Sequence, residues 1–222
     1  MKTILFNEIN FLIKKEIQQE WKQKYAFQGL LLYVVSTVFV CYLSFKQIID
    51  PPTWNALFWI ILLFAGVNAV AKSFMQESRG RLLYYYTLAD ARSIIMAKTI
   101  YSLLLMITLS VISLFFYSLF VGSPIVNYPM YFLAMALGSA GFATVLSMVS
   151  AIASKAGSNA TLMAVLSFPI LIPLLMTTIR FSKNAMDGLA WSVNVNFMII
   201  LVSLNVLVIA LSYLLFPYLW RE

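Results

Sequence analysis

Five stretches of this sequence contain no charged residue and are long enough to cross a membrane. They cover residues 25–45, 51–71, 99–154, 156–179 and 188–220. About 20 apolar residues in a helix span the hydrocarbon core of a bilayer, and a helix satisfies its own backbone polar groups there. Hydrophobic residues make up 62% of the chain and charged residues only 10%, against roughly 25% charged in soluble domains. The sequence therefore predicts an integral membrane protein.

The stretch 99–154 is too long for a single crossing. It contains a turn-forming segment with Gly122, Ser123, Pro124, Asn127 and Pro129, and such residues end helices. Two helices are expected there, which makes six in all. The predicted fold is all-α: a polytopic membrane protein whose single domain covers residues 1–222 and whose transmembrane helices lie near 25–45, 53–71, 99–121, 130–153, 161–179 and 196–219.

An amphipathic helix is predicted before the first span, over residues 2–24. Leu5, Ile9, Ile13, Ile17 and Trp21 recur every four residues, which places them on one side of a helix. This pattern is typical of a helix that lies in the membrane interface. The apolar stripe also takes in Glu16 and Glu20, which leaves two interpretations open: a solvated edge, or carboxylates that meet other parts of the protein.

The distribution of basic residues predicts the orientation. All but three of the 15 lysines and arginines lie in the N-terminal segment, in the loop 72–98, in the short loop near 154–160 or at the C-terminus. The exceptions are Lys46, Arg180 and Lys183. Since basic residues accumulate on the cytoplasmic side, both termini and the charged loop 72–98 are expected in the cytoplasm. The net charge of +7 is spread over these loops, which argues against nucleic-acid binding.

Several kinds of chemistry are not expected in this chain. None of the eight glycines is followed by lysine, so the GxxxxGK[ST] loop that cradles nucleotide phosphates is absent. The sequence has no histidine, the commonest metal and haem ligand and the commonest general base. Methionine in apolar helices usually serves packing. We therefore expect no bound cofactor, no metal and no enzymatic activity in this chain.

The spans contain no ionisable Asp, Glu, Lys or Arg, and their polar and small residues carry the remaining signals. Asn68 and Asn205 predict either interhelical hydrogen bonds or the lining of a pathway. Small residues recur about every turn of the fourth span, at Ala134, Gly138, Gly141, Ala143, Ser147 and Ala151. Small side chains let helices approach closely, so this helix is expected inside the bundle or at a dimer contact.

The fifth span contains Pro169 and Pro173 in the segment LSFPILIPLLM. A proline inside a helix removes a backbone donor and pushes on the preceding turn. Two prolines four residues apart predict a bend on one side of the helix. We interpret them as a hinge or a re-entrant element, with a static kink as the alternative.

Four segments follow one another along almost the whole chain: KKEIQQEWKQKYAFQGLLLYVV, FWIILLFAGVNAVAKSFMQESRGRL, LGSAGFATVLSMVSAIASKAGSNATLMAVLSFPILIPLLM and LLFPYLW. Together, in this order, they resemble the CcmB family, the permease subunit of the cytochrome c maturation ABC transporter. The resemblance implies a six-helix permease of the ABC-2 type in the bacterial inner membrane. It also implies a pair of permeases acting with a cytoplasmic ATPase subunit, a haem-handling membrane protein and a periplasmic haem chaperone.

In that scheme one segment of the 72–98 loop looks like the coupling helix that docks on the ATPase. Its residues are Glu77, Arg79, Gly80, Arg81 and Leu82. The sequence departs from the family just after this segment, where Thr87, Leu88, Ala89 and Asp90 stand in place of a proline-containing turn.

The expected function is therefore the coupling of ATP hydrolysis, in a separate subunit, to haem export or to release of the haem-loaded chaperone. Haem would be handled by other subunits. Two alternatives stay open at this point. One is an ABC-2 exporter of a lipid, glycan or drug, and the other is a non-transporting scaffold for membrane assembly.

Overall fold

The computed structural model describes residues 2–22, 24–45, 50–75, 90–155 and 160–221. Within these ranges every element is an α-helix, and six of the helices are long and apolar enough to cross a membrane. The N-terminal helix α1 is the exception. The predicted all-α fold, with six spanning helices after an N-terminal helix, is confirmed. The helices are α1 (Lys2–Lys22), α2 (Lys24–Phe45), α3 (Pro51–Met75), α5 (Ala91–Val121), α6 (Tyr128–Lys155), α7 (Ala160–Met186) and α8 (Trp191–Arg221).

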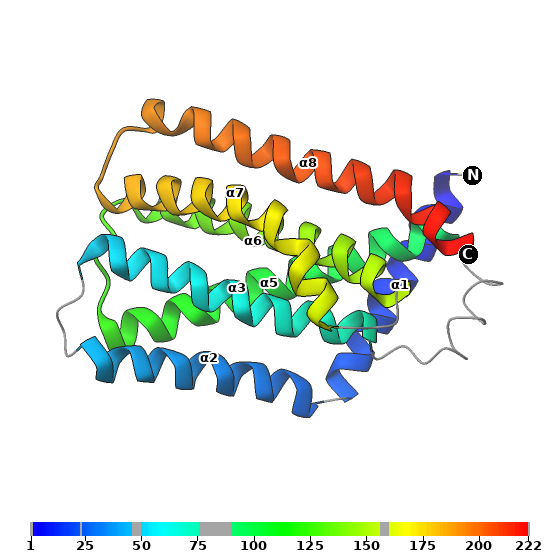
Figure 1. Ribbon diagram of the computed structural model, residues 1–222, viewed down its shortest axis with the longest axis horizontal. Helices are drawn as coiled ribbons and strands as arrows, with labels where there is room; N and C mark the ends of the chain where they lie inside the picture. Colours follow the sequence, from blue (N-terminus) through cyan, green and yellow to red (C-terminus); the bar gives the residue numbers. More distant parts are fainter. Residues whose placement is uncertain (1, 23, 46–49, 76–89, 156–159, 222) are drawn as a thin grey trace.

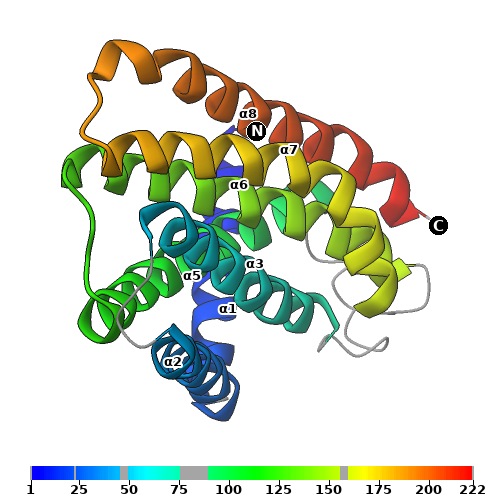
Figure 2. The same ribbon diagram turned by 60° about the vertical axis from the view of Figure 1, so that its left-hand side comes forward.

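Helices α3 and α6 form the centre of the bundle. In their most apolar segments 61% and 67% of the residues are buried, against 17% in α2 and 28% in α8. Figures 1 and 2 accordingly show α2 and α8 at opposite edges. Helix α6 contacts α3, α5, α7 and α8, so it is the helix around which most of the others are arranged.

Large aromatic side chains are prominent in the core, and the outer surface is covered by apolar side chains of both kinds, aliphatic and aromatic. The largest fully buried side chains include Trp54, Trp59, Tyr117, Tyr131, Phe58 and Phe142. Large apolar side chains that remain exposed include Leu43, Phe115, Val165, Ile199, Val206 and Leu214. An apolar outer surface of this extent is what contact with lipid requires, because the hydrocarbon core cannot hydrogen-bond polar groups.

Two helices that border the 72–98 loop reach further into it than the predicted spans. Helix α3 continues to Met75, and α5 begins at Ala91 rather than near residue 99. The first turns of α5 therefore carry Arg92 and Lys98. At about 1.5 Å per residue a helix as long as α5 exceeds the roughly 30 Å hydrocarbon core, so its charged turns have room at the membrane surface.

Helix α1 runs across one end of the bundle rather than along it, as Figure 1 shows. It packs mainly on α5, with a smaller contact to α2. The start of α1 and the end of α8 lie at this same end of the molecule. We call it the terminal end, and we call the other end, which carries the turns at residues 122–127 and 187–190, the far end.

Candidate coupling site and its supporting helices

The predicted coupling residues lie outside the described residues, but the helices on both sides of them are described. The residues concerned are Glu77, Arg79, Gly80, Arg81 and Leu82. Helix α3 ends at Met75 and α5 begins at Ala91, both at the terminal end of the bundle (Figure 1). The predicted site is therefore attached to the central helix α3 on one side and to α5 on the other.

The first turns of α5 are covered by α1. Leu12 of α1 is buried in an apolar cluster at the terminal end, with Ile9 and Ile13 partly buried beside it. The other buried members of the cluster are Ala91, Ile94, Ile95 and Ala97 of α5, Ala151 of α6 and Phe216 of α8. This contact explains why α1 crosses the bundle end: part of its apolar side packs against protein.

Two polar contacts accompany this apolar packing. The Lys98 ammonium lies 3.4 Å from Glu16 Oε1, and the two side chains are only 4% and 10% exposed. The Ser93 hydroxyl donates a hydrogen bond of 3.1 Å to Glu8 Oε2. The Lys15 ammonium, on the same helix as Glu16, also lies 3.4 Å from this Glu16 oxygen. Of the two interpretations of Glu16, contact with protein is therefore the one observed, while the side chain of Glu20 lies outside the described residues.

Helix α5 is also tied to α8 at the terminal end. The Arg92 guanidinium carbon lies 5.0 Å from the centroid of the Tyr213 ring, within the range of a cation–π interaction. The beginning of α5 is thus held by α1 on one side and by α8 on another.

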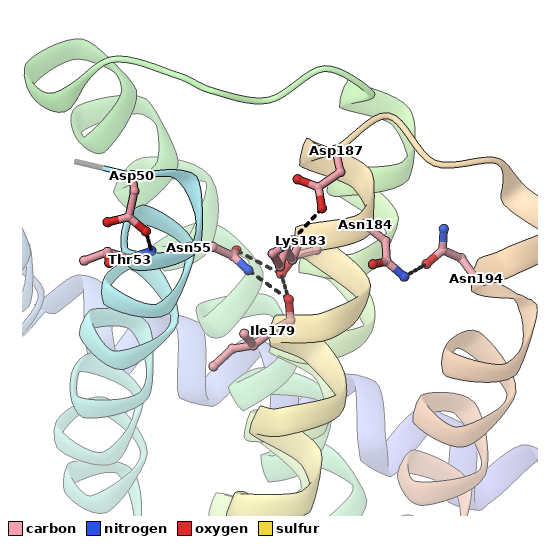
Figure 3. Close-up of polar contacts among 9 residues, drawn as sticks. Asp50, Thr53, Asn55, Ile179, Lys183, Asn184, Asp187 and Asn194 are labelled. Carbon is pink, nitrogen blue, oxygen red and sulfur yellow. Dashed lines mark hydrogen bonds and ion pairs between the residues drawn. The ribbon is translucent and has the colours of Figure 1, made fainter. Parts of the chain in front are cut away.

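At the far end, buried hydrogen bonds join α3 to α7 (Figure 3). The Asn55 amide donates to the Ile179 carbonyl at 2.8 Å. The Ser182 hydroxyl lies 2.9 Å from Asn55 Oδ1 and accepts a 2.8 Å hydrogen bond from the Trp59 indole. Asn55, Trp59 and Ser182 are each at most 1% exposed. We call these three residues the α3–α7 clamp.

The same end of α7 is tied to α8 and to the turn before α6. Asn184 donates to Asn194 at 2.9 Å, a contact visible in Figure 3. The backbone amide of Asn127 donates to the Ala185 carbonyl at 3.0 Å. On the surface, the Lys183 ammonium forms an ion pair with Asp187 at 2.6 Å. The last two turns of α7 are therefore anchored on three sides.

The start of α3 is capped by Asp50, whose carboxylate accepts a 3.2 Å hydrogen bond from the Thr53 amide (Figure 3). Hydrogen bonds from the hydroxyl and the amide of Thr53 hold the pKa of the Asp50 carboxyl below its ordinary value. A carboxylate at this position satisfies helix amides that have no intrahelical partner. Trp54 also donates to the Gly122 carbonyl at 2.9 Å, which fixes the far end of α3 to the turn after α5.

Pro169 and Pro173 lie in the other half of α7, closer to the terminal end. Both side chains are exposed, on the outer face that also shows Phe168, Ile172 and Met176. The helix passes through both prolines without a break, so the structure contains a bent helix rather than a re-entrant element. Figure 1 shows the bend in this part of α7. Each proline lacks the amide hydrogen that would otherwise bond the preceding turn.

Gly138 and Gly141 make their close contacts inside the bundle. A Cβ atom added at Gly138 would lie 2.7 Å from the Trp59 ring, and one at Gly141 would collide with Leu174. Glycine is thus required where α6 meets α3 and α7. Of the two predicted alternatives, the bundle interior is the one that the contacts of these glycines support.

The two asparagines behave differently. Asn205 of α8 donates to the Leu137 carbonyl of α6 at 3.2 Å and to its own helix at Leu201. Asn68 is exposed on α3, and among the described residues its amide donates to the Phe64 carbonyl of its own helix at 3.0 Å. The structure therefore provides the predicted interhelical bond for Asn205 alone.

A family model described as CcmB protein matches residues 8–218, nearly the whole chain. The chain belongs to the CcmB family. It is therefore a permease subunit of the haem-exporting ABC transporter of cytochrome c maturation, and a multi-pass membrane protein. No curated protein matches the sequence.

Membership of the CcmB family places the chain in a complex with an ATPase subunit. The described residues contain no group of three His, Cys, Asp or Glu side chains placed to hold a metal ion. This part of the chain consists of long packed helices, two of which, α3 and α5, flank the predicted coupling segment in the sequence.

The sequence did not predict the residues that form the buried hydrogen bonds between α3 and α7, or the lysine of the buried ion pair between α1 and α5. Asn55 and Ser182 were not singled out, because one lies near the start of a predicted span and the other beyond the predicted end of another. Lys98 was assigned to the charged loop, whereas it is a buried residue of α5. A buried lysine needs a partner, and the carboxylates in the apolar stripe of α1 were the available signal.

Proposed function

We propose that this CcmB-family chain couples ATP hydrolysis by a separate cytoplasmic subunit to haem export or to release of the haem-loaded periplasmic chaperone. Glu77, Arg79, Gly80, Arg81 and Leu82 form the docking site for the ATPase. One observation carries this assignment: the segment joins the end of α3 to the start of α5, and both helices are packed into the bundle. A displacement of the segment thus acts directly on the core.

The orientation of the chain follows the distribution of basic residues. Twelve of the 15 lysines and arginines fall in residues 2–24, 72–98, 155 and 221, and those that the structure describes lie in the helix segments of the terminal end. We infer that this end faces the cytoplasm, where ATP is available, because basic residues accumulate on that side. The far end then faces the periplasm, where the haem chaperone acts.

The proposed movement passes from α3 to α7. Since the α3–α7 clamp fixes the far-end half of α7, a tilt of α3 displaces the two helices together there. The half of α7 that carries Pro169 and Pro173 has fewer intrahelical hydrogen bonds, and bending is concentrated at such positions. We assign these prolines the role of a hinge on this basis.

Partner subunits supply the chemistry in this proposal. ATP binds to the ATPase, and haem is held by a membrane partner and the periplasmic chaperone, because this chain has neither a phosphate-binding loop nor histidine. Two copies of the chain form the permease within the surrounding lipid. Gly138 and Gly141 are already covered by their own chain, so the pairing surface lies elsewhere.

Charge reversal in the coupling segment tests the proposal. The double variant Glu77→Lys with Arg81→Glu should lower ATPase activity or assembly of the complex by about ten-fold or more, since like charges across an interface cost several kcal/mol. Membrane insertion should stay normal. The matched control is Lys183→Glu with Asp187→Lys, which reverses an exposed ion pair at the far end. Unchanged activity and assembly in the first variant would refute the coupling assignment.

A further inference from the structure

The interface between α1 and α5 contains an ion pair and a hydrogen bond in addition to its apolar packing. Leu12 of α1 is buried in the apolar cluster, and Ile9 and Ile13 pack partly buried against it. Even so, Glu16 meets Lys98 and Glu8 meets Ser93 in the same contact. Burying an ion pair removes two charges from water, and its best-attested use is to fix a relative position rather than to add stability. The pair therefore indicates that the register of α1 on α5 matters.

This contact lies where the coupling segment joins the bundle. It covers α5 from Ala91, its first residue, to Lys98, two turns further on. Any displacement of the start of α5 must either carry α1 along or separate Glu16 from Lys98. Separation would leave both charges buried without each other, which is strongly unfavourable.

Helix α1 leads directly into α2, which packs on α5 and α3. Only one residue separates Lys22 from Lys24, and α2 has the smallest buried share of the spanning helices. A movement of α1 across the terminal end would therefore reach the start of α2. Within the described part of the chain, Glu16 forms ion pairs with Lys98 on α5 and with Lys15 on its own helix.

We propose that Glu16 and Lys98 are positioning residues that lock α1 to α5, so that α1 moves with α5 and transmits displacement of the coupling segment to α2. This inference rests on the proposed function. It adds a second route, through α1, to the route through α3 and α7. The pair acts by holding two helices together and does not touch haem or nucleotide.

Variants of the pair test this lock in the complete complex with its ATPase. Glu16→Gln and Lys98→Met should each lower the yield of mature cytochrome c by about five-fold or more. ATPase activity should change by less than about two-fold, because ATP hydrolysis continues while less of the displacement reaches α2. The loss in the double variant should be clearly smaller than the product of the two single losses, as expected for residues that are coupled to each other. Lys14→Met, exposed on the same helix, is the matched control and should leave both activities unchanged.

Other results of this experiment would overturn the proposal. A purely structural pair would lower ATPase activity and maturation in proportion, and independent residues would give losses that multiply in the double variant. An unchanged yield of mature cytochrome c in both single variants would also overturn the proposal. Each yield of mature cytochrome c is divided by the amount of this chain that co-purifies with the ATPase. If the unmodified chain binds no ATPase, the proposed function itself fails.

A distance measurement keeps the proposal testable if a variant folds poorly. Spin labels are placed at Gln18→Cys on α1 and Leu104→Cys on α5, both exposed, with Cys41→Ser. The α1–α5 distance should be the same without nucleotide and with trapped ATP, and a change would overturn the lock. The reference pair Leu104→Cys and Val165→Cys, between α5 and α7, should change. No change in the reference pair would count against the proposed function.

Discussion

At the scale of single residues, the two asparagines of α3 show how position decides the role of one side chain. Asn55 is fully buried and bonds two groups of α7. Asn68 is exposed and bonds its own helix. An unsatisfied buried polar group costs far more than an exposed one, because no water replaces the lost partner. Asn55 is therefore expected to contribute to stability and Asn68 is not.

Replacement of each asparagine by alanine tests this difference. Asn55→Ala leaves the Ile179 carbonyl and the Ser182 hydroxyl without this partner, and should lower the free energy of unfolding by about 1–3 kcal/mol. Asn68→Ala in the same helix is the control and should change it by less than about 0.5 kcal/mol. Thermal unfolding of the purified chain in one detergent measures both. Equal losses in the two variants would contradict the α3–α7 clamp.

At the scale of the helix, α7 has two unlike halves. The half from Thr178 to Met186 is bonded to α3, to α8 and to the turn before α6. The half with Pro169 and Pro173 lacks two intrahelical donors and presents the prolines outward. A helix anchored at one end and weakened near its middle can bend without breaking the anchored contacts.

Replacement of both prolines in α7 tests the hinge. The variant Pro169→Ala with Pro173→Ala restores two amide donors and straightens the helix, since proline is the main cause of sharp kinks. We expect cytochrome c maturation to fall by about five-fold or more, with a thermal unfolding midpoint that is unchanged or raised, because helix propensity improves. Pro217→Ala in α8 is the control. If the double variant matures cytochrome c normally, the prolines only shape the helix.

At the scale of the whole molecule, the bundle has a terminal end with α1 and the predicted coupling segment, and a far end closed by the α3–α7 clamp and the turns. Figure 1 shows the start of α1 and the end of α8 together, which six spanning helices require. The outer faces between these ends are apolar. The proposed coupling depends on the terminal end being cytoplasmic.

Labelling of single cysteines tests this orientation. In a Cys41→Ser background, Ser123→Cys at the far end and Gln18→Cys on α1 are both exposed. A membrane-impermeant maleimide added to cells with a permeable outer membrane should label Ser123→Cys at once. It should label Gln18→Cys only after the inner membrane is opened, because the distribution of basic residues predicts that the terminal end lies in the cytoplasm. The reverse pattern would invert the topology and rule out docking of a cytoplasmic ATPase.

The sequence by itself determined the class of fold and the number of spanning helices. Charge-free runs of membrane length, interrupted by the turn residues at 122–129, are local properties that need no knowledge of packing. The four ordered segments that resemble the CcmB family indicated the biological context in the same way, and the family match over residues 8–218 confirmed it.

Only the tertiary structure decided which polar residues meet. Glu16 and Lys98 are 82 positions apart, and Asn55 and Ser182 are 127 apart. No spacing rule within a helix relates such residues, since helical periodicity orders only neighbours three or four positions away. The same holds for Gly138, whose need for glycine comes from the Trp59 ring on another helix. Burial and partners of this kind arise when whole helices pack, because each contact depends on the placement of both elements.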